Sequence, residues 1–411
     1  MLPRRLAGEI QVALKDTPVL FLNGARQTGK STMARELICP EGKPMRYLTL
    51  DDAPVLAAAR NDPPGFIAGL GGPVVLDEVQ RAPDLFLAIK AAVDRNRKPG
   101  QFLLTGSADV LLLPNISESL AGRMEIFTLW PLSQGEMERS HDNIVDALFA
   151  KSIKPYRGKE DRAASIERVA RGGYPVVQQR ALDARRRAWF GGYLTTILQR
   201  DIRELSNIDD LTMMPRLLEL LATRICALLN IADISRSIAI PQTTLKRYFT
   251  LLETTFLVQT LHAWSANLGL RLVKSPKIYL NDTGLAAYLL GLNAAQLAAN
   301  PMALGPLLEN FVLMELRKQS GWTAVRPNFY HFRTHSGDEV DIVLEDAAGN
   351  LVGIEVKASA SVGAADVKGL RAFAELASSR FRRGVVFYLG SETVPFAKNI
   401  HAMPVESLWR G

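Results

Sequence analysis

The sequence predicts a multidomain α/β protein with a parallel β-sheet in its N-terminal part, and three observations support this fold class. The chain has 411 residues, more than one hydrophobic core usually organises. Short apolar strands alternate with helical stretches between residues 18 and 107, which is typical of a parallel sheet with crossover helices. Helical periodicity dominates after residue 134, and a second α/β segment, a helix followed by strands, begins near residue 306.

Composition and charge narrow the class of protein. Hydrophobic residues make up 47% of the chain and charged residues 22%, which are ordinary values for a soluble globular protein. No segment approaches the roughly 18 uninterrupted apolar residues of a membrane span. The N-terminal segment lacks the apolar core of a signal peptide, and Cys39 and Cys226 have no paired spacing, so we expect a cytoplasmic protein with reduced thiols. The net charge of +7 favours an anionic partner such as nucleic acid, although positive charge also serves solubility.

A phosphate-binding loop is the first motif along the chain. Residues 24–31 read GARQTGKS, follow an apolar strand and begin a helix. Such a loop turns its backbone N–H groups inward and the helix N-terminus adds partial positive charge, so a triphosphate is held electrostatically. Lys30 would reach the β- and γ-phosphates, and the Ser31 hydroxyl would coordinate Mg²⁺. The residues expected to contact ATP are Gly24, Ala25, Arg26, Gln27, Thr28, Gly29, Lys30, Ser31 and Thr32.

Two acids complete the predicted nucleotide site. The strand in PVVLDE ends at Asp77 and Glu78, where Asp77 would hold the Mg²⁺ shell and Glu78 would orient or deprotonate the attacking water. The strand in FLLTGS ends in small polar residues, of which Ser107, or otherwise Thr105, would contact the γ-phosphate or the water. The simpler alternative is that both hydroxyls satisfy backbone groups at a strand end. The sequence therefore predicts binding and hydrolysis of ATP.

Arg123, in the segment SLAGR, follows in a turn-rich stretch. An arginine at this place could reach the ATP of a neighbouring subunit and stabilise transition-state charge. That interpretation requires a homo-oligomer, for which a hexameric ring is one arrangement. An exposed arginine that contacts a local carboxylate explains the residue equally well.

Motifs in one order cover nearly the whole chain: NGARQTGKST, VVLDEVQR, FLLTGSA, SLAGR, GGYP, LQRDI, SPKIYLNDTGLAAYLLG, LLENFVLMEL, DEVDIVLED and GIEVK. This set resembles bacterial and archaeal AAA+ ATPases of the additional-strand P-loop class that carry a C-terminal domain of formerly unknown function. The resemblance implies an ATPase core at residues 1–135, a helical lid at 136–210, a winged helix-turn-helix at 211–290 and a PD-(D/E)XK nuclease-like domain at 291–411. It also implies that Gly173 and Pro175 pack on the adenine and that Arg171 contacts phosphate, whereas GGYP alone could be a helix-joining turn.

Three apolar-periodic helices between residues 215 and 261 have the order of a helix-turn-helix motif. The third helix starts at Pro241, and its first turns would face a DNA groove. Two short strands in the segment after Leu261 would form a wing. The expected groove contacts are Gln242, Thr243, Thr244, Lys246 and Arg247; the expected core residues are Leu245, Phe249 and Leu252; the expected phosphate contacts are Arg236, Arg271 and Lys274. Winged helices also serve as packing or protein-contact modules, which is the alternative here.

The last part of the chain contains Glu309, Asp341, Glu355 and Lys357 in the order of the PD-(D/E)XK nuclease signature. Asp341 lies seven residues before Ala348 and Glu355 seven residues after it, so a symmetric hairpin would oppose the two carboxylates on one face. They would share Mg²⁺ or Mn²⁺, with Glu309 as a further ligand. Lys357 would stabilise developing charge or position the water. The alternative is a solvent-exposed polar strand face. We interpret His331 and His335 as surface or core residues rather than metal ligands.

Together these observations predict a cytoplasmic ATPase that acts on DNA. The expected activity is DNA remodelling or translocation, including branched junctions, with metal-dependent phosphodiester cleavage as an added reaction. Two alternatives stay open: a nucleotide-driven signalling switch, and a toxin–antitoxin or defence component. In both, the C-terminal domain would bind a partner without cutting.

Overall fold

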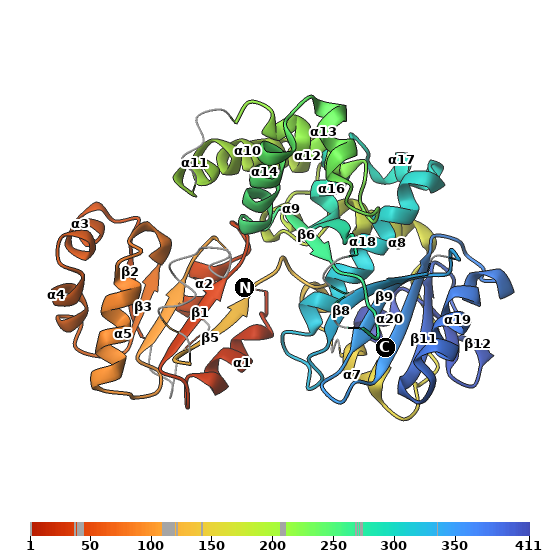
Figure 1. Cartoon of the computed structure of the whole chain (residues 1–411), viewed down its shortest axis with the longest axis horizontal. Coiled ribbons are helices and arrows are strands. Elements are labelled where there is room, and N and C mark those ends of the chain that lie inside the picture. The colour runs from red at the N-terminus through yellow and green to blue at the C-terminus, as the bar shows by residue number, and fades with distance from the viewer. Residues whose placement is uncertain are drawn as a thin grey trace. The chain divides into compact units, whose positions relative to one another are not determined.

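The computed structural model describes residues 2–36, 38, 45–108, 120, 122–140, 143–205, 211–267, 269, 271, 274–334 and 336–411, with the side chains of 201, 204 and 205 excepted. These residues form two compact units (Figure 1). Unit 1 comprises Met1–Leu132 and Thr250–Leu257, and unit 2 comprises Ser133–Phe249 and Val258–Gly411. Cys39 and His335 lie outside the described residues. Within the described ranges, no helix has the length and apolar character needed to cross a membrane.

Unit 1 is built on a five-stranded parallel sheet in the order β2-β3-β4-β1-β5. Its strands are β1 (Val19–Asn23), β2 (Arg46–Thr49), β3 (Val74–Asp77), β4 (Phe102–Thr105) and β5 (Met124–Thr128). The parallel sheet predicted from the sequence is confirmed, and β5 adds a strand that was not predicted. Because β4 lies between β1 and β3, the carboxyl ends of all three strands meet at one edge, where ligands bind in open α/β sheets.

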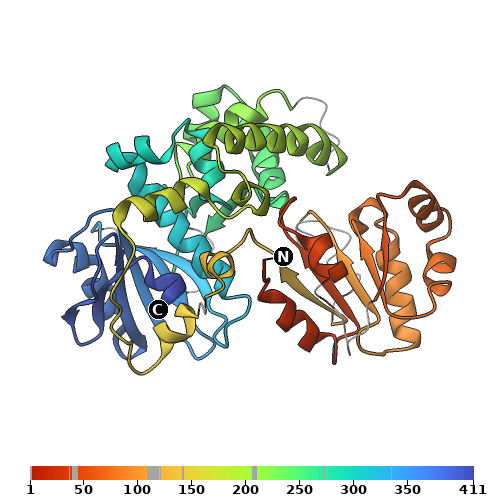
Figure 2. The same cartoon turned by 180° about the vertical axis from the view of Figure 1, so that it is seen from behind.

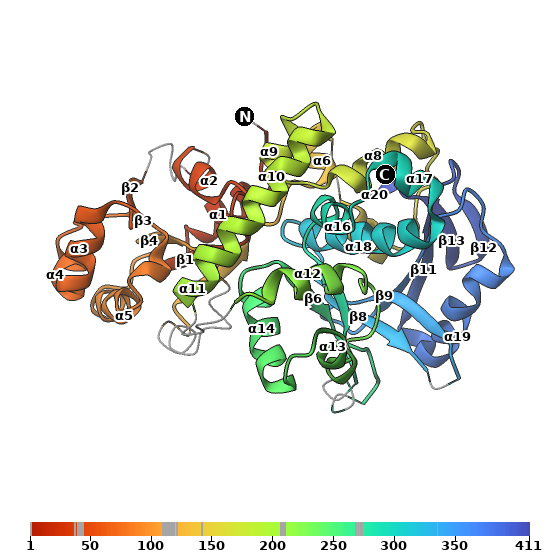
Figure 3. The ribbon, with the colours of Figure 1, turned by 90° about the horizontal axis from the view of Figure 1, so that it is seen from above.

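Helices cover both faces of this sheet, with α2 and α5 on opposite sides (Figure 3). Leu20 and Leu22 of β1 pack with α1 and α2, whereas Val19 and Phe21 pack with α3, α4 and α5. A strand buried on both faces has a continuous apolar sequence, which explains why VLFLN shows no alternation. The helices are α1 (Leu6–Ala13), α2 (Lys30–Glu36), α3 (Ala53–Asn61), α4 (Pro63–Ala68) and α5 (Leu85–Arg95), with a 3₁₀ turn at Val79–Arg81.

Unit 2 contains a six-stranded mixed sheet in the order β12-β13-β11-β10-β9-β8. Its strands are β8 (Asn328–Arg333), β9 (Glu339–Glu345), β10 (Leu351–Lys357), β11 (Phe381–Tyr388), β12 (Val394–Ala397) and β13 (Ile400–Pro404). The β9–β10 hairpin pairs Leu351 with Glu345 and Ile354 with Ile342, so it is symmetric about Ala348 as predicted. Continued by one residue, this register sets Asp341 opposite Glu355.

Two helices flank this sheet, α18 (Pro301–Gln319) beside β10 and α19 (Lys368–Ala377) beside β9, β10 and β11. The sequence predicted that the first of these helices would begin at Leu307. It begins six residues earlier because the Asn300 side chain caps it, accepting a hydrogen bond from the Ala303 backbone N–H at 3.2 Å. Pro306 therefore lies inside the helix.

The rest of unit 2, together with the last turn of α14 that clusters with unit 1, is largely helical. The helices are α6 (Gln134–Glu138), α7 (Ile144–Phe149), α8 (Arg162–Arg171), α9 (Pro175–Gln178), α10 (Asp183–Thr196), α11 (Ile202–Leu205), α12 (Met214–Ala222), α13 (Ile231–Ile238), α14 (Gln242–Thr254), α16 (Thr283–Leu289), α17 (Ala294–Ala299) and α20 (Ser407–Arg410), with one π-helical turn at Ile197–Asp201. An antiparallel pair of strands, β6 (Val258–Leu261) and β7 (Lys277–Leu280), follows α12, α13 and α14. The predicted order of three helices and a two-stranded hairpin is present, and Leu245, Phe249 and Leu252 are buried as expected.

Two details of the predicted winged helix are wrong. The first strand ends at Leu261, before the segment predicted to hold it, because His262 and Trp264 bond instead to the backbone of His331 in β8, at 2.9 and 2.6 Å. Arg271, predicted to contact phosphate, is buried, and its guanidinium donates to Glu345 at 2.6 and 3.2 Å. It therefore neutralises an internal carboxylate.

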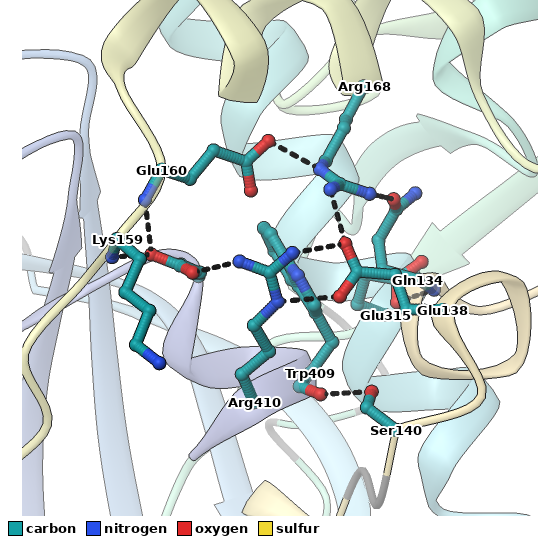
Figure 4. A network of polar contacts seen from close by, with 10 residues as sticks. Gln134, Glu138, Ser140, Lys159, Glu160, Arg168, Glu315, Trp409 and Arg410 are labelled. Carbon is teal, nitrogen blue, oxygen red and sulfur yellow. Dashed lines mark hydrogen bonds and ion pairs between the residues drawn. The ribbon is translucent and has the colours of Figure 1, made fainter.

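The C-terminal residues close unit 2 through a polar network (Figure 4). Arg410 donates to both carboxylate oxygens of Glu138, at 2.6 and 2.7 Å, and Ser140 Oγ donates to the Trp409 carbonyl at 2.5 Å. Arg168 of α8 donates to the same Glu138 carboxylate. The end of the chain is thus bonded to the first helix of the unit.

A second segment links the early part of unit 2 to the C-terminal sheet. The Gly158 backbone N–H donates to the Ser391 carbonyl at 2.7 Å. The backbone N–H groups of Lys159 and Glu160 donate to the Glu406 carboxylate at 2.7 and 3.0 Å. Figure 2 shows this yellow segment beside the blue strands. Part of the segment predicted as a helical lid therefore packs on the C-terminal sheet.

Candidate nucleotide site and C-terminal pocket

The phosphate-binding loop joins β1 to α2 and has the backbone conformation that its glycines permit. Gly24 has a φ of +139° and Gly29 a φ of +98°, which side-chain-bearing residues rarely adopt. A Cβ atom on Gly24 would lie 2.3 Å from the Leu129 carbonyl oxygen, whereas one on Gly29 would meet nothing nearer than 3.9 Å. Only glycine therefore fits at residue 24 without moving the backbone of the strand beside it.

Lys30 and Ser31 begin α2 beneath this loop. The Lys30 ammonium donates to the carbonyls of Gly24 and Ala25 at 2.8 and 2.9 Å, which places it inside the loop. Ser31 Oγ lies 3.1 Å from both carboxylate oxygens of Asp77. An ammonium, a hydroxyl and a carboxylate at a helix N-terminus are the groups that hold a magnesium–triphosphate, so these residues fit Mg²⁺ and ATP.

Asp77, at the end of β3, accepts hydrogen bonds from three hydroxyl groups. Besides Ser31, these are Thr105 of β4 and Tyr47 of β2, whose hydroxyl lies 2.5 Å from Asp77 Oδ2. Burial, and the hydrogen bond to Asp77, raise the pKa of Tyr47 to about 12, so this phenol keeps its proton at neutral pH. Three donors fix the carboxylate next to the helix that would carry the phosphates. Tyr47 was not predicted from the sequence.

Glu78 follows in a left-handed conformation, with a φ of 57°, which turns its side chain away from the strand direction. Its Oε2 atom accepts hydrogen bonds from the Gln80 amide and from Ser107 Oγ, the latter at 3.3 Å. Gln80 also donates to Ser107 at 3.2 Å. The structure therefore brings the predicted base together with Ser107, and it adds Gln80, which stands two residues beyond Glu78 in DEVQR and was not predicted.

Arg4 is a further residue at the loop that the sequence did not reveal. Its guanidinium donates to the carbonyls of Thr28 and Trp130, each at 2.6 Å. It thus ties the phosphate-binding loop to the segment after β5. A single arginine near the chain start carries no local signal of this contact.

Arg123 precedes β5, whose first residue pairs with Val19 at the start of β1. The phosphate-binding loop follows the other end of β1, roughly 16 Å away at 3.3 Å per residue. The Arg123 guanidinium contacts Asp94 of α5 at 2.5 Å, and this ion pair lowers the pKa of Asp94. The local carboxylate contact is present, so any role in hydrolysis would have to concern the ATP of another copy.

The GGYP segment lies in unit 2, between α8 and α9. The Gly173 N–H donates to Asp282 at 2.7 Å, and a Cβ atom on Gly172 would lie 2.1 Å from that carboxylate. Tyr174 is buried, and its hydroxyl lies 2.6 Å from that of Tyr193. The segment is a helix-joining turn packed on the NDTG motif. Contact of Pro175 with adenine stays a prediction.

The four nuclease-like residues line one cavity of about 520 Å³ in unit 2. Glu309 comes from α18, Asp341 from β9, and Glu355 and Lys357 from β10. Asp341 Oδ2 accepts the Val356 N–H at 3.0 Å, and Lys357 donates to Glu355 at 3.1 Å. Burial and the charge of Asp341 raise the pKa of Glu309 to about 7 and that of Glu355 to about 9.

A lysine that the sequence did not reveal lies among these acids. The Lys277 ammonium, from β7, is 3.1 Å from Glu309, 2.8 Å from Glu339 and 3.3 Å from Asp341. Among the residues that the structure describes, no three His, Cys, Asp or Glu side chains converge as metal ligands. The predicted shared site of Glu309, Asp341 and Glu355 for Mg²⁺ or Mn²⁺ therefore does not fit this arrangement. His331 is buried, as one of the interpretations of that residue expected.

Comparison with family models divides the chain into three parts. Residues 16–138 match a model described as an AAA domain. Residues 162–296 and 304–408 match two models described as domains of unknown function, DUF8612 and DUF4143. The first match contains the phosphate-binding loop and both acids of the nucleotide site. It supports the predicted ATPase core.

Two mycobacterial proteins are similar to nearly the whole chain. They are the uncharacterized proteins Rv2008c of Mycobacterium tuberculosis and Mb2031c of Mycobacterium bovis, each 33% identical over 408 residues, which is 98% of this chain and 84% of the relative. Among solved structures, the RuvB Holliday junction branch migration motor of Thermotoga maritima is 17% identical, with a TM-score of 0.30 over 63% of this chain and 89% of that one. A signal transduction ATPase of Pyrococcus horikoshii is 11% identical, with a TM-score of 0.21 over 77% of this chain and 46% of that one. TM-scores this low carry no argument about function.

Proposed function

This chain belongs to the family of the two mycobacterial proteins, and from its AAA domain and the geometry of the nucleotide site we propose that it hydrolyses ATP with Mg²⁺ to drive an action on DNA. The observation that carries the first half of the proposal is the meeting of Lys30, Ser31 and Asp77 at one sheet edge, with Glu78 beside them. Magnesium supplies charge neutralisation on the phosphates when bound. The chain's own groups then position the nucleotide and take the proton of the attacking water.

The test of ATP hydrolysis compares two substitutions that act at different stages. Lys30→Ala removes the ammonium inside the loop and should abolish both tight ATP binding and turnover. Glu78→Gln keeps the hydrogen-bonding shape but removes the base, so it should retain ATP without hydrolysing it. The control is Lys98→Ala, which removes an exposed lysine of the same unit, and this variant should hydrolyse ATP at the normal rate. Normal steady-state turnover by both site variants would refute the assignment.

DNA is the proposed partner because α12, α13, α14 and the β6–β7 hairpin have the order of a winged helix. Lys246 and Arg247 are exposed in the first turns of α14 while Leu245 is buried, so the basic residues face outward. The net charge of +7 adds a general attraction to phosphate. The ATPase rate measured with single-stranded, duplex and four-way-junction DNA tests this partner. A rate indifferent to all three, with slow nucleotide release, would favour the signalling switch.

For the C-terminal pocket, binding of a partner without cutting is favoured over metal-dependent cleavage. The observation is the Lys277 ammonium among the carboxylates, since a hard divalent cation needs those oxygens itself. Linear and four-way-junction DNA incubated with Mn²⁺ should stay intact with the wild-type protein. Cleavage that is lost in Asp341→Ala would overturn this part of the proposal and leave the ATPase assignment untouched.

A further inference from the structure

Lys277 is held in place by its backbone on both sides. On one side, β7 pairs with β6, where Lys277 is opposite Leu261. On the other side, the Cys226 N–H donates to the Ile278 carbonyl at 2.7 Å, and the Ile278 N–H donates to the Ala227 carbonyl at 3.0 Å. A strand bonded along both edges cannot shift easily. The side chain is only 4% exposed, and it lines the inside of the cavity.

The carboxylates around Lys277 are already engaged by protein donors. Both oxygens of Asp341 accept hydrogen bonds, Oδ1 from Lys277 at 3.3 Å and Oδ2 from the Val356 N–H at 3.0 Å. Glu309 Oε1 accepts from Lys277 at 3.1 Å and from the Tyr279 hydroxyl at 2.6 Å. Mg²⁺ requires such oxygens at about 2.0–2.1 Å in near-octahedral geometry. These lone pairs are therefore committed to nitrogen and hydroxyl donors.

Charged groups of both signs line the pocket. The ion-paired groups at its centre are the carboxyls of Glu309, Glu339, Asp341 and Glu355 and the ammonium groups of Lys277 and Lys357; Asp338, Asp366 and Lys368 line the rest of the cavity. Burial acts to lower the pKa of Lys277, but the three carboxylates beside it hold that pKa well above its ordinary value.

We propose that Lys277 is the resident cation of the C-terminal pocket: its tethered ammonium takes the place of a divalent metal and excludes metal from the carboxylates. The inference rests on the non-cutting role proposed for the pocket and gives that role its cause. It also makes the pocket composite, because the cation comes from β7 and its partners from α18 and β9. Residues 291–411 alone would hold the acids without their counter-ion.

The experiment replaces this cation in the full-length protein, without nucleotide. Lys277→Met keeps the length of the side chain and removes its charge, which should lower the melting temperature in EDTA by roughly 5–10 °C, as expected when one partner of a buried ion pair is lost. Mn²⁺ should restore at least half of that loss, and electron paramagnetic resonance should count one more bound Mn²⁺ than in wild type. Wild type should melt at the same temperature in EDTA and in Mn²⁺.

Lys318→Met is the matched control. Lys318 is buried like Lys277 and pairs at 2.7 Å with Glu315, but it does not line the C-terminal pocket. Its melting temperature should fall without any rescue by Mn²⁺. An equal lack of rescue in Lys277→Met would reduce Lys277 to an ordinary buried ion pair and overturn the inference.

One measurement needs no substitution of Lys277 and therefore holds even where Lys277→Met fails to fold. Wild-type protein and the Asp341→Asn variant should bind the same amount of Mn²⁺, because no Mn²⁺ binds at Asp341. If wild type binds Mn²⁺ that the Asp341→Asn variant does not bind, and DNA is not cleaved, the proposal that Lys277 excludes metal is overturned and the non-cutting role stands. Cleavage in EDTA without Mn²⁺ uptake would instead overturn the non-cutting role.

Discussion

Replacing Gln80 by alanine should lower kcat for ATP about tenfold and leave the affinity for ATP unchanged. The Gln80 amide donates to Glu78 Oε2, and a hydrogen bond to a charged group contributes about 1.5–3 kcal/mol. Ser107 Oγ donates to the same oxygen at 3.3 Å and stays in the variant, so the loss should lie at the lower end, about 1.5 kcal/mol. That free energy corresponds to about a tenfold change in rate. The substitution also removes the 3.2 Å hydrogen bond from the Gln80 amide to Ser107 Oγ, whereas Gln80 Oε1 has no hydrogen-bond partner among the described residues.

The assay is steady-state phosphate release, with binding of a fluorescent ATP analogue measured separately. Gln101→Ala is the control, because this glutamine donates to the carbonyls of Asn96 and Lys98 in an exposed part of the same unit. The double variant Gln80→Ala/Ser107→Ala should approach the rate of Glu78→Gln, since both donors to the base are then gone. A kcat within twofold of wild type, or a tenfold weaker affinity at unchanged kcat, would refute the positioning of Glu78 by Gln80.

Three further predictions concern DNA, assembly and pH. Lys246→Glu combined with Arg247→Glu should reduce the slope of log affinity for duplex DNA against log salt by about 0.9 for each phosphate that the variant no longer neutralises; an unchanged slope would make the winged helix a protein-contact module. Arg123→Ala protein should be inactive alone and regain ATPase activity when mixed with Lys30→Ala protein, if the arginine acts on another copy; strictly additive activity on mixing would exclude shared sites. Burial lowers the pKa of His331 to about 4, so the unfolded chain takes up a proton at this residue below about pH 6.5 that the folded chain does not, and the contribution of His331 to stability should fall as the pH drops from about 6.5 to 4. In chemical denaturation, the free energy of unfolding of wild type minus that of His331→Asn should decrease by up to about 3 kcal/mol over this range, because the other titrating groups cancel in the difference, whereas a difference that does not change with pH would refute the assignment.

The parts of the molecule that the sequence predicted correctly depend on local patterns. The phosphate-binding loop follows the buried strand β1, and Asp77 and Glu78 stand at the end of the buried strand β3. Parallel strands bring their carboxyl ends to one edge of a sheet. The β9–β10 hairpin could be predicted because the residues on either side of Ala348 are equally spaced, so a tight turn there fixes the register. In both cases a short segment contains the whole argument.

Lys277 and Arg271 show why the rest could not be predicted. Both are basic residues near a predicted wing, and an exposed place on DNA is the ordinary interpretation of such residues. The structure buries them instead against Asp341 and Glu345, which lie 64 and 74 residues further along the chain. Pairing over such distances depends on how β6 and β7 pack on the C-terminal sheet, and one sequence carries no signal of that packing. Tyr47 and Arg4 were missed because their partners are also distant in the sequence: Asp77 lies 30 residues from Tyr47, and Trp130 lies 126 residues from Arg4.

The closure of unit 2 by its last residues has a consequence for how the chain is made. Glu138 emerges from the ribosome 272 residues before its partner Arg410, which at 5–20 residues per second is a delay of roughly 15–55 s. Throughout that time Glu138 lacks the Arg410 guanidinium, and Ser140 lacks the Trp409 carbonyl that it binds. A stalled chain would therefore carry the complete phosphate-binding loop in unit 1 together with a unit 2 that lacks these bonds. Chaperones and proteases act on such incompletely packed intermediates, so unit 2 is open to both until these late contacts form.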